Sequence, residues 1–518
     1  MIKSMNIAFW VQRWRELHPE KPAIIFNDSV ITYRELHLRS NRTASWLQSL
    51  GIEKGDRVAV MLMNSLEFIE VFLACSRLGA IFVPINYRVT DRELNHPIVN
   101  ARPRVFIFDQ LYIDMIESIG LGDQLPPMLL AVVGDVPSSG NIHQYNRETA
   151  VFDGKQPFVS RSLGPSDPEE PQVIMYTSGT TGAPKGAVLS HRKTFFNCLN
   201  AEIFFKLNFD DIMLIVLPLF HSGGLFIQAA PTLYKGATIL LQSKFDPVSV
   251  YRDIKKYRVS KFLGVPTVFR SLLNVPPEQR SDVSSLKTIA GGGEKTSKDL
   301  FQACKAAGFG FRQIMGQTET SILLWASEDV SLNRPGTVGR PVFHAEVSIL
   351  DRNGTRVRPG EIGEIVVRGS IMMKEYWQDP EQTDATIKNG YLHTGDLAYV
   401  DQDGYYYLVD RVDDMYISGG ENVYPAEVEA VLREMEGIDD IAVIGVPDET
   451  WGFIGHAFII PQKGRTFELA DVQRHCHERL ARYKLPKQIT FVKDLPRTAL
   501  GKVRKTELHR QMASTHTF

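Results

Sequence analysis

A loop rich in glycine, serine and threonine is the first segment of this chain whose residue types could perform chemistry. Its sequence is Tyr176-Thr177-Ser178-Gly179-Thr180-Thr181-Gly182-Ala183-Pro184-Lys185-Gly186. Glycines let backbone N–H groups turn toward one point, and the hydroxyls and Lys185 add donors and a positive charge. These groups suit a polyphosphate, although the loop lacks the Gly-Lys-Ser/Thr of a Walker A motif. A flexible surface linker is the alternative, which the apolar, strand-like segments at 173–176 and 187–189 disfavour.

The segments that must position this loop alternate between strand-like and helix-like patterns. Residues 55–63 and 81–84 are typical of buried strands, with helical periodicity between them. After the loop, Ser190 is placed to cap a helix. Apolar residues recur at helical spacing in that helix, namely Phe195, Leu199 and Ile203. Strands alternating with helices predict an α/β fold with a largely parallel sheet.

The later part of the chain predicts a change of architecture. Residues 363–368 and 405–408 are typical of strands in a β-rich region. Beyond Arg411, Pro425 is typical of the start of a helix. Strand-like segments follow at 441–446, 457–460 and 488–492. The chain of 518 residues is too long for one hydrophobic core, and its last part suffices for a small separate α/β domain.

Composition and charge disfavour several classes of protein. The net charge of −2, from 58 basic and 60 acidic side chains, gives no reason to expect nucleic acid or an anionic membrane as a partner. Four cysteines lie far apart without zinc-type spacing, which predicts buried free thiols: Cys75, Cys198, Cys304 and Cys476. With no secretory signal and no bilayer-length apolar stretch, we expect a cytoplasmic protein without a transmembrane segment. The oligomeric state is open, and a homodimer is one option.

Further short motifs follow the loop along the chain. They are Leu217-Pro218-Leu219-Phe220-His221, Gly291-Gly292-Gly293-Glu294, Gly316-Gln317-Thr318-Glu319, Arg334-Pro335-Gly336-Thr337-Val338-Gly339, Leu392-His393-Thr394-Gly395-Asp396, Asp410-Arg411-Val412-Asp413-Asp414, Ser418-Gly419-Gly420-Glu421-Asn422-Val423-Tyr424-Pro425 and Pro496-Arg497-Thr498-Ala499-Leu500-Gly501-Lys502. Together with the loop they resemble the adenylate-forming superfamily, which contains acyl-CoA synthetases, firefly luciferase and the adenylation domains of nonribosomal synthetases. The resemblance, to the acyl-CoA synthetase type, covers nearly the whole chain, and the common order of the motifs makes it specific.

The resemblance implies an architecture and a reaction. A large N-terminal adenylation domain, 1–412, would combine parallel-sheet α/β subdomains with a β-rich subdomain. A small mobile α/β domain, 413–518, would carry the catalytic lysine and turn about a hinge at Asp413. The implied reaction is ATP-dependent acid–CoA ligation, in which a carboxylic acid and ATP give acyl-AMP and pyrophosphate, and the acyl group then passes to CoA. ATP and CoA are the implied co-substrates, and Mg²⁺ the implied metal.

The same resemblance implies roles for individual side chains. Lys502 would meet the α-phosphate and the substrate carboxylate, where a cation lowers the barrier between two anions. Glu319 would hold Mg²⁺ beside the phosphates, Thr177 would be a further catalytic residue, and His221 would be a gate near the carboxylate pocket, although a lone histidine is more often structural. Asp396 would accept hydrogen bonds from the ribose hydroxyls. The implied nucleotide contacts are Thr177, Ser178, Gly179, Thr180, Thr181, Gly182, Lys185, Gly292, Gly293, Glu294, Met315, Gly316, Gln317, Thr318, Asp396 and Arg411.

Two further pockets are implied. The acyl pocket would be lined by His221, Gly223, Gly291, Gly292 and Thr320. Its glycines predict room for an acid larger than acetate, in the order medium-chain fatty acid, longer fatty acid, benzoate- or cinnamate-like acid. A tunnel for the pantetheine arm of CoA would be lined by Gly419, Gly420 and Glu421. A plain turn is the alternative for this glycine pair.

Met315 departs from the family pattern, which has Tyr or Phe at this position to stack on adenine. Such stacking is worth about 1–3 kcal/mol, so a thioether predicts weaker ATP affinity or, more sharply, an impaired adenylation step. Three other functions stay open, which are an adenylating enzyme that loads a carrier protein, a non-catalytic acyl or nucleotide sensor, and a luciferase-type oxygenase. The intact motif residues argue against the sensor.

Overall fold

The computed structural model describes residues 5–89, 91–118, 128–134, 142–154, 167–177, 184–293, 296–412, 414–418, 421–448, 451–477, 479–480, 482–497 and 501–515. By their contacts these residues form two compact units. The first comprises the described parts of 1–177, 183–346 and 367–392, and the second those of 347–366 and 393–518. The expected division into 1–412 and 413–518 concerns a hinge, which one conformation does not test, so it stays a prediction.

One sheet of the first unit carries the glycine-rich loop between two of its strands. Its strand order is β19-β9-β8-β4-β3-β5-β6-β7. The strands are β3 (Arg57–Met61), β4 (Ile81–Pro84), β5 (Val105–Asp109), β6 (Leu129–Val133), β7 (Ile142–Gln144), β8 (Pro171–Thr177), β9 (Lys185–Ser190) and β19 (Glu375–Tyr376). Neighbours from β8 to β7 pair in parallel, whereas β9 returns antiparallel to β8 and aligns Thr177 with Lys185.

The other sheet of the first unit has the order β16-β15-β14-β13-β12-β10-β11-β1-β2. Its strands are β1 (Pro22–Phe26), β2 (Ser29–Thr32), β10 (Ile212–Ile215), β11 (Thr238–Leu241), β12 (Lys261–Gly264), β13 (Thr288–Gly292), β14 (Arg312–Gln317), β15 (Ser321–Ala326) and β16 (Thr337–Pro341). The strands from β14 to β1 pair in parallel, and β14 and β15 form an antiparallel hairpin. The largely parallel α/β fold predicted from the sequence is confirmed.

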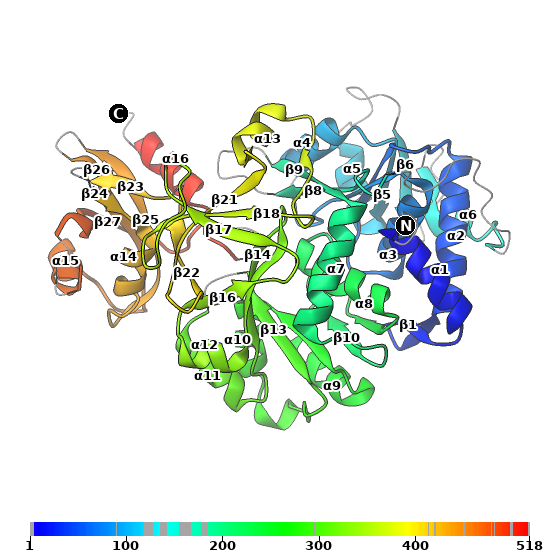
Figure 1. Cartoon of the computed structure of the whole chain (residues 1–518), viewed down its shortest axis with the longest axis horizontal. Coiled ribbons are helices and arrows are strands. Elements are labelled where there is room, and N and C mark those ends of the chain that lie inside the picture. Colours follow the sequence, from blue (N-terminus) through cyan, green and yellow to red (C-terminus); the bar gives the residue numbers. More distant parts are fainter. Residues whose placement is uncertain are drawn as a thin grey trace. The chain divides into compact units, whose positions relative to one another are not determined.

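Helices pack between and around these sheets, as Figure 1 shows for α7 and its neighbour α8. The helix predicted after Ser190 is confirmed as α7, and the Ser190 side chain accepts a hydrogen bond from the Lys193 backbone N–H. The helices of the first unit are α1 (Ile7–Leu17), α2 (Tyr33–Ser49), α3 (Leu66–Leu78), α4 (Asp91–Ala101), α5 (Ile113–Ser118), α6 (Tyr145–Thr149), α7 (His191–Phe205), α8 (Ala230–Lys235), α9 (Pro247–Tyr257), α10 (Pro266–Leu273), α11 (Lys298–Ala306), α12 (Glu328–Asn333) and α13 (Pro380–Thr386).

The second unit combines a β-rich part with a small α/β part. The strands β17 (Glu346–Leu350), β18 (Gly363–Arg368), β21 (Tyr391–Val400) and β22 (Tyr406–Arg411) are neighbours in that order. The α/β part has the strand order β24-β23-β26-β25, with β27 paired to β26. Its elements are β23 (Tyr416–Ser418), β24 (Glu421–Val423), β25 (Ile438–Asp448), β26 (Gly452–Pro461), β27 (Gln488–Phe491), α14 (Pro425–Leu432), α15 (Leu469–His477) and α16 (Lys505–Thr515). The strands and the Pro425 helix predicted here are confirmed.

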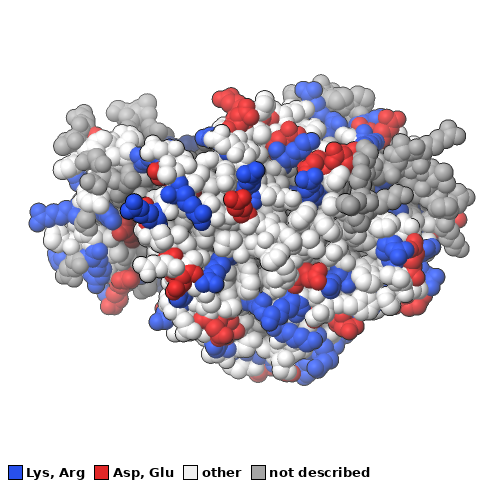
Figure 2. All heavy atoms as spheres, viewed as in Figure 1, with Lys and Arg blue, Asp and Glu red and all other residues white. Residues whose placement is uncertain are grey.

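Burial and charge agree with the sequence-based expectations. The four cysteines are buried and free, as expected of structural thiols. No helix within the described ranges is long and apolar enough to cross a membrane. On the face in Figure 2, Lys and Arg side chains are interspersed with Asp and Glu side chains among the described residues, as expected from a net charge of −2.

Candidate active site

The carboxylate of Glu319 is the centre of a polar group in the first unit. Glu319 is only 6% exposed and lies in the turn between β14 and β15. The Tyr376 hydroxyl donates a hydrogen bond to Glu319 Oε1 at 3.0 Å, and the Thr177 hydroxyl lies 3.4 Å from the same oxygen. The Met373 N–H donates to the Glu319 carbonyl at 2.6 Å. Hydroxyls from β8 and β19 thus converge on one buried carboxylate oxygen.

A tight β14–β15 hairpin places this carboxylate. A Cβ on Gly316 would come within 1.8 Å of the Ser321 carbonyl oxygen, so only glycine permits this approach. The Thr320 N–H donates to the Gln317 carbonyl at 3.1 Å, which closes the turn around Thr318. Ser321 has a φ of 59°, in the region that favours glycine. The motif residues 316–320 therefore form one rigid turn.

A buried lysine that sequence reasoning missed lies against this turn. Lys193 is 1% exposed, and its Nζ donates to Ser321 Oγ at 2.6 Å. Burial lowers the pKa of Lys193 to about 7, and the charge of Glu319 acts in the opposite direction. A buried ammonium is unfavourable unless a nearby anion compensates it. The sequence signal for it was weak, because one lysine in the first turn of a helix is typical of a solvated surface position.

Lys185 and Thr177 mark the two ends of the glycine-rich loop. Lys185 Nζ donates to Gln382 Oε1 of α13 at 2.5 Å and lies 5.6 Å from the centre of the Tyr376 ring. Tyr376 therefore links the lysine at the end of the loop to the Glu319 carboxylate. The predicted contacts within the loop lie outside the described residues, namely Ser178, Gly179, Thr180, Thr181 and Gly182.

Several of the residues predicted to contact the nucleotide lie at the ends of β13 and β14. Gly292 pairs with Ile314, directly before Met315. Met315 is buried, with 9% of its surface exposed, whereas Gly293 beyond the end of β13 is exposed. The position where the family has an aromatic ring is thus filled by an enclosed thioether. Glu294 lies outside the described residues.

The predicted acyl pocket is less open beside its glycines than the sequence suggested. A Cβ on Gly291 would come within 2.5 Å of the Phe311 ring, and one on Gly292 would come within 2.5 Å of Ile314. These glycines therefore allow close packing of β13, and the argument that their missing side chains create room is wrong on that side of the strand. Gly223 is less constrained, since a Cβ there would meet only a Leu217 methyl at 3.2 Å. Thr320 is fully buried.

His221 lies just before a π-helix, Gly223–Ala229, in this region. Burial lowers the pKa of His221 to about 4, so its ring is neutral at pH 7. Its Nε2 is enclosed and has no hydrogen-bond partner among the described residues, and the same is true of the adjacent Ser222 Oγ. A neutral, enclosed imidazole suits a structural or gating role better than general base catalysis.

A second polar group lies within the second unit, around Asp396. Arg411 Nη1 donates to Asp396 Oδ1 at 2.8 Å, and the two residues are direct partners across β21 and β22. Glu364 fixes the part of β21 that directly precedes Asp396. Its carboxylate accepts a hydrogen bond from the Gly395 N–H at 2.9 Å and contacts His393 Nδ1 at 2.7 Å. Burial raises the pKa of Asp396, while the charges of Arg411 and Lys502 act in the opposite direction. Lys502, an exposed side chain, is therefore within electrostatic reach of Asp396.

Several predicted residues cannot be placed. Asp413, Gly419 and Gly420 lie outside the described residues, as does the side chain of Glu421.

The group around Glu319 fits the magnesium ion that the resemblance implies. Mg²⁺ prefers hard oxygen ligands, and in nucleotide sites one or two carboxylates suffice because phosphate oxygens and water complete its shell. Glu319 supplies one buried carboxylate, with the hydroxyls of Thr177 and Tyr376 beside it. No cluster of three or more His, Cys, Asp or Glu with metal-binding geometry occurs among the residues that the structure describes, so phosphate oxygens and water would have to supply most of the ligands at Glu319.

Comparison with known proteins identifies the family of this chain. Residues 11–377 match the family model of the AMP-binding enzymes, and residues 427–502 match that of the AMP-binding enzyme C-terminal domain. Feruloyl-CoA synthase from Amycolatopsis is 36% identical over 98% of this chain and 100% of its own length. Indoleacetate–CoA ligase from Aromatoleum aromaticum is 37% identical over 99% of each chain.

Two further comparisons concern a fatty-acid ligase and a solved structure. The long-chain fatty-acid–CoA ligase FadD13 from Mycobacterium tuberculosis is 33% identical over 98% of this chain and 99% of its own length. The crystal structure of ATP-bound MatB from Rhodopseudomonas palustris matches with a TM-score of 0.87 and 29% identity, covering 99% of this chain and all of the other. The chain therefore belongs to the AMP-binding enzyme family, within the acyl-CoA synthetase type of the adenylate-forming superfamily. It is an ATP-dependent, AMP-forming acid–CoA ligase.

Proposed function

We propose that this ligase activates an aromatic carboxylic acid, of the arylalkanoic or cinnamate-like class, and passes it to CoA. In the first step a carboxylate oxygen attacks the α-phosphorus of ATP, and the bond to pyrophosphate breaks. In the second step the thiol sulfur of CoA attacks the acyl carbon, loses its proton, and releases AMP. The convergence of the Tyr376 and Thr177 hydroxyls on the buried Glu319 carboxylate carries the proposal.

Glu319, Thr177 and Tyr376 act on the phosphates in this proposal. Glu319 would hold Mg²⁺, which when bound offsets the charge of the triphosphate. The Tyr376 hydroxyl fixes the orientation of the Glu319 carboxylate, because a hydrogen bond to a charged group is stronger than one between neutral groups. Lys185 approaches the face of the same tyrosine and supplies a positive charge at the end of the loop.

Asp396, Arg411 and Lys502 act on the nucleotide and the reacting anions. The Asp396 carboxylate accepts from the ribose hydroxyls, and its pairing with Arg411 fixes its direction. Lys502 is placed to reduce repulsion between the α-phosphate and the carboxylate in the transition state. Its electrostatic interaction with Asp396 supports this role.

The class of acid is inferred from two observations. The relatives at 36–37% identity act on ferulate and indoleacetate, whereas the fatty-acid ligase is 33% identical. Beside the predicted pocket, His221 Nε2 and Ser222 Oγ have no hydrogen-bond partner within the described part of the chain. Buried polar atoms of this kind are better matched by an acid with a polar ring substituent than by an alkyl chain. A medium- or long-chain fatty acid is the second candidate, on the similarity to FadD13.

A competition experiment tests the proposal. We would incubate the protein with ATP, Mg²⁺, CoA and equimolar ferulate, cinnamate, indoleacetate, decanoate and palmitate, and identify the thioesters by mass spectrometry. The proposal predicts that aryl-CoA products form first. Dominant decanoyl- or palmitoyl-CoA would reverse the order of the candidates. Acyl-adenylate without any CoA thioester would favour a carrier protein as the acceptor, which a parallel reaction with a phosphopantetheinylated carrier protein would reveal.

A further inference from the structure

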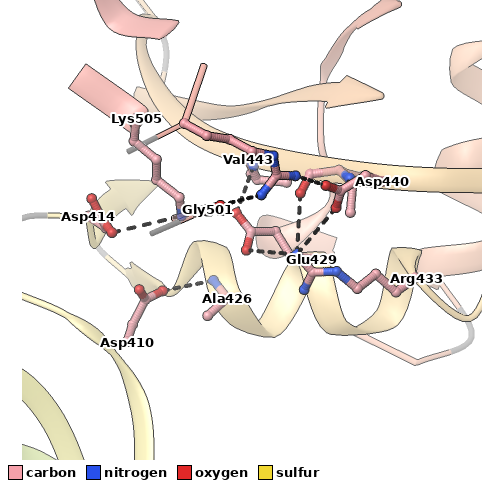
Figure 3. Close-up of polar contacts among 11 residues, drawn as sticks. Asp410, Asp414, Ala426, Glu429, Arg433, Asp440, Val443, Gly501 and Lys505 are labelled. Atoms are coloured by element: carbon pink, nitrogen blue, oxygen red, sulfur yellow. Dashed lines mark hydrogen bonds and ion pairs between the residues drawn. The ribbon is translucent and has the colours of Figure 1, made fainter. Parts of the chain in front are cut away.

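A buried lysine three residues after Lys502 is part of a charged cluster that the reaction scheme does not use. Lys505 is the first residue of α16, and its side chain is only 13% exposed. Its Nζ lies 2.9 Å from Glu429 Oε1 of α14 and 3.9 Å from Asp414 Oδ2 (Figure 3). Burial by itself lowers the pKa of Lys505, but Glu429, Asp414 and Asp410 outweigh it and the net shift is upward. The surrounding carboxylates therefore favour the charged form of the ammonium.

The carboxylates around Lys505 are themselves fixed by backbone groups. Glu429 Oε1 accepts from the Val443 N–H of β25 at 2.9 Å, and Asp410 Oδ2 accepts from the Ala426 N–H at the start of α14 at 2.8 Å. Figure 3 shows these contacts converging on the first turns of α14. Burial raises the pKa of Asp410 to about 6, and Lys505 acts in the opposite direction. Through these two carboxylates, Lys505 is connected to the backbone of β25 and of α14.

The segment between Lys502 and this anchor is short and is also held at its other end. Arg497 Nη1 donates to the Gly501 carbonyl at 2.5 Å, and Arg497 also pairs with Asp440. The Arg504 N–H donates to the Pro496 carbonyl at 2.7 Å. Lys502 therefore lies between two anchored points, with the Gly501 carbonyl directly before it and Lys505 three residues after it.

A purely stabilising role is a poor explanation of the cluster. Removing two charges from water costs several kcal/mol per ion, and apolar replacements of a buried ion pair are often neutral or stabilising. Apolar packing is also available to α16, because Leu508 is fully buried against Ala442 and Phe458. The ion pair between Lys505 and Glu429 instead fixes the position of the first residue of α16, and so restricts where Lys502, three residues earlier, can lie.

Two carboxylates of the cluster flank, in the sequence, the residue predicted to be the hinge. Asp410 precedes Asp413 by three residues, and Asp414 follows it directly. We propose that Lys505 is a positioning residue for adenylation, which through Glu429 and Asp414 holds the 501–505 segment so that Lys502 stays beside Asp396. The inference rests on the proposed function, in which Lys502 serves the adenylation step and not the transfer to the thiol.

The test separates the two half-reactions in Lys505→Met. Adenylation is followed by ATP–pyrophosphate exchange with a pool of ferulate, indoleacetate and decanoate, and thiol transfer by adding CoA to the synthetic adenylates of these acids. Because misplacing a catalytic group by about 1 Å can lower a rate roughly 100-fold, we expect exchange to fall about 10- to 100-fold. Transfer should stay within about twofold, and the loss should appear in kcat more than in the KM for ATP. Lys505→Arg should restore most of the exchange rate.

Controls separate positioning from folding. Lys493→Met removes an exposed lysine after β27 and should leave both half-reactions unchanged. Lys505→Met leaves the carboxylate of Glu429 buried without a positive partner, which could destabilise the fold. A second variant therefore combines Lys505→Met with Glu429→Gln. It removes both charges, so the net charge stays the same, and the glutamine oxygen can still accept from the Val443 N–H. Hydrogen–deuterium exchange should then rise in 501–505 while β25 and β26 stay protected.

Each remaining outcome overturns the inference. Equal losses in both half-reactions would mean a structural role only, and unchanged exchange in a folded variant would mean no role in adenylation. Absence of exchange in the unaltered protein would overturn the proposed function itself, and the inference with it.

Discussion

At the scale of single residues, the shared carboxylate of Glu319 explains more of the site than any one motif. Tyr376 and Thr177 come from strands distant in sequence and address the same Oε1 atom. Glu319 was identifiable because the preceding Gly316-Gln317-Thr318 marks it. Tyr376 was not, because an aromatic pair such as Tyr376-Trp377 has no spacing that distinguishes a site residue from a core residue.

Tyr376→Phe tests this shared oxygen. The change removes a hydrogen bond to a buried carboxylate, a contact worth about 1.5–3 kcal/mol, so we expect kcat/KM for adenylation to fall roughly tenfold or more. The measurement is ATP–pyrophosphate exchange. Tyr257→Phe is a matched control, because its hydroxyl also contacts a carboxylate, that of Asp28, but outside the predicted site. Equal rates in Tyr376→Phe and the unaltered protein would contradict the proposed role of Tyr376.

Met315→Tyr tests the departure from the family pattern. An aromatic ring at the end of β14 would stack on adenine, a contact worth about 1–3 kcal/mol, so the KM for ATP should fall about fivefold or more. The initial rate of exchange as a function of ATP concentration gives this value. A large rise in kcat would support the sharper hypothesis of an impaired adenylation step, and no change in either constant would reject both hypotheses.

At the scale of elements, the sequence predicted the helices and strands better than the faces they bury. Ser190 and the spacing of Phe195, Leu199 and Ile203 predicted α7, yet Ile203 is 47% exposed. The buried face of α7 is mixed instead, and its polar residues Lys193, Thr194, Asn197 and Asn200 lie among apolar ones that include Ala201, Phe204 and Phe205. Periodicity finds a helix, but it assigns the apolar face to the core, and that rule fails where a helix covers a polar site.

The β14–β15 hairpin gives a prediction for this scale. In Gly316→Ala the new Cβ would meet the Ser321 carbonyl oxygen, so the hairpin must open and Glu319 must move. We expect a loss of about 1–3 kcal/mol in the free energy of unfolding and a larger proportional loss of exchange activity. Denaturant unfolding and exchange assays measure the two effects. A Gly316→Ala variant with an unchanged free energy of unfolding and an unchanged exchange rate would contradict the tight turn.

At the scale of the whole molecule, the α/β class and the order of elements followed from alternating patterns and ordered motifs. The division into two compact units did not follow from any pattern in the sequence. Their membership depends on contacts between segments far apart in sequence, such as 347–366 with 393–412, which no local pattern encodes. The room expected beside Gly291 also failed, because Phe311, twenty residues later, fills it.

Stability toward acid is a property of the whole molecule to which the buried histidines are expected to contribute. Burial lowers the pKa of His191 to about 4, below the usual 6.5, so the unfolded chain binds a proton between these values when the folded chain does not. Its stabilising contribution is complete above pH 6.5 and is lost as the pH falls toward 4. His37 and His221 act in the same direction.

His191→Gln should therefore flatten the pH dependence of unfolding. Between pH 7 and 4.5 we expect the unaltered protein to lose about 2 kcal/mol more free energy of unfolding than the variant. Denaturant titrations at the two pH values, with the exposed His477→Gln as the control, give the difference. Parallel curves for His191→Gln and the unaltered protein would mean that His191 is protonated in the fold.

The path of a carboxylate oxygen tests the central claim most directly. The acid selected in the competition experiment would be labelled with ¹⁸O in both carboxylate positions and converted with ATP and CoA, and the products weighed by mass spectrometry. Attack on the α-phosphorus predicts that AMP gains one labelled oxygen while pyrophosphate gains none. Label in phosphate or pyrophosphate, or unlabelled AMP beside a CoA thioester, would contradict an acyl-adenylate intermediate and with it the roles proposed for Glu319, Asp396 and Lys502.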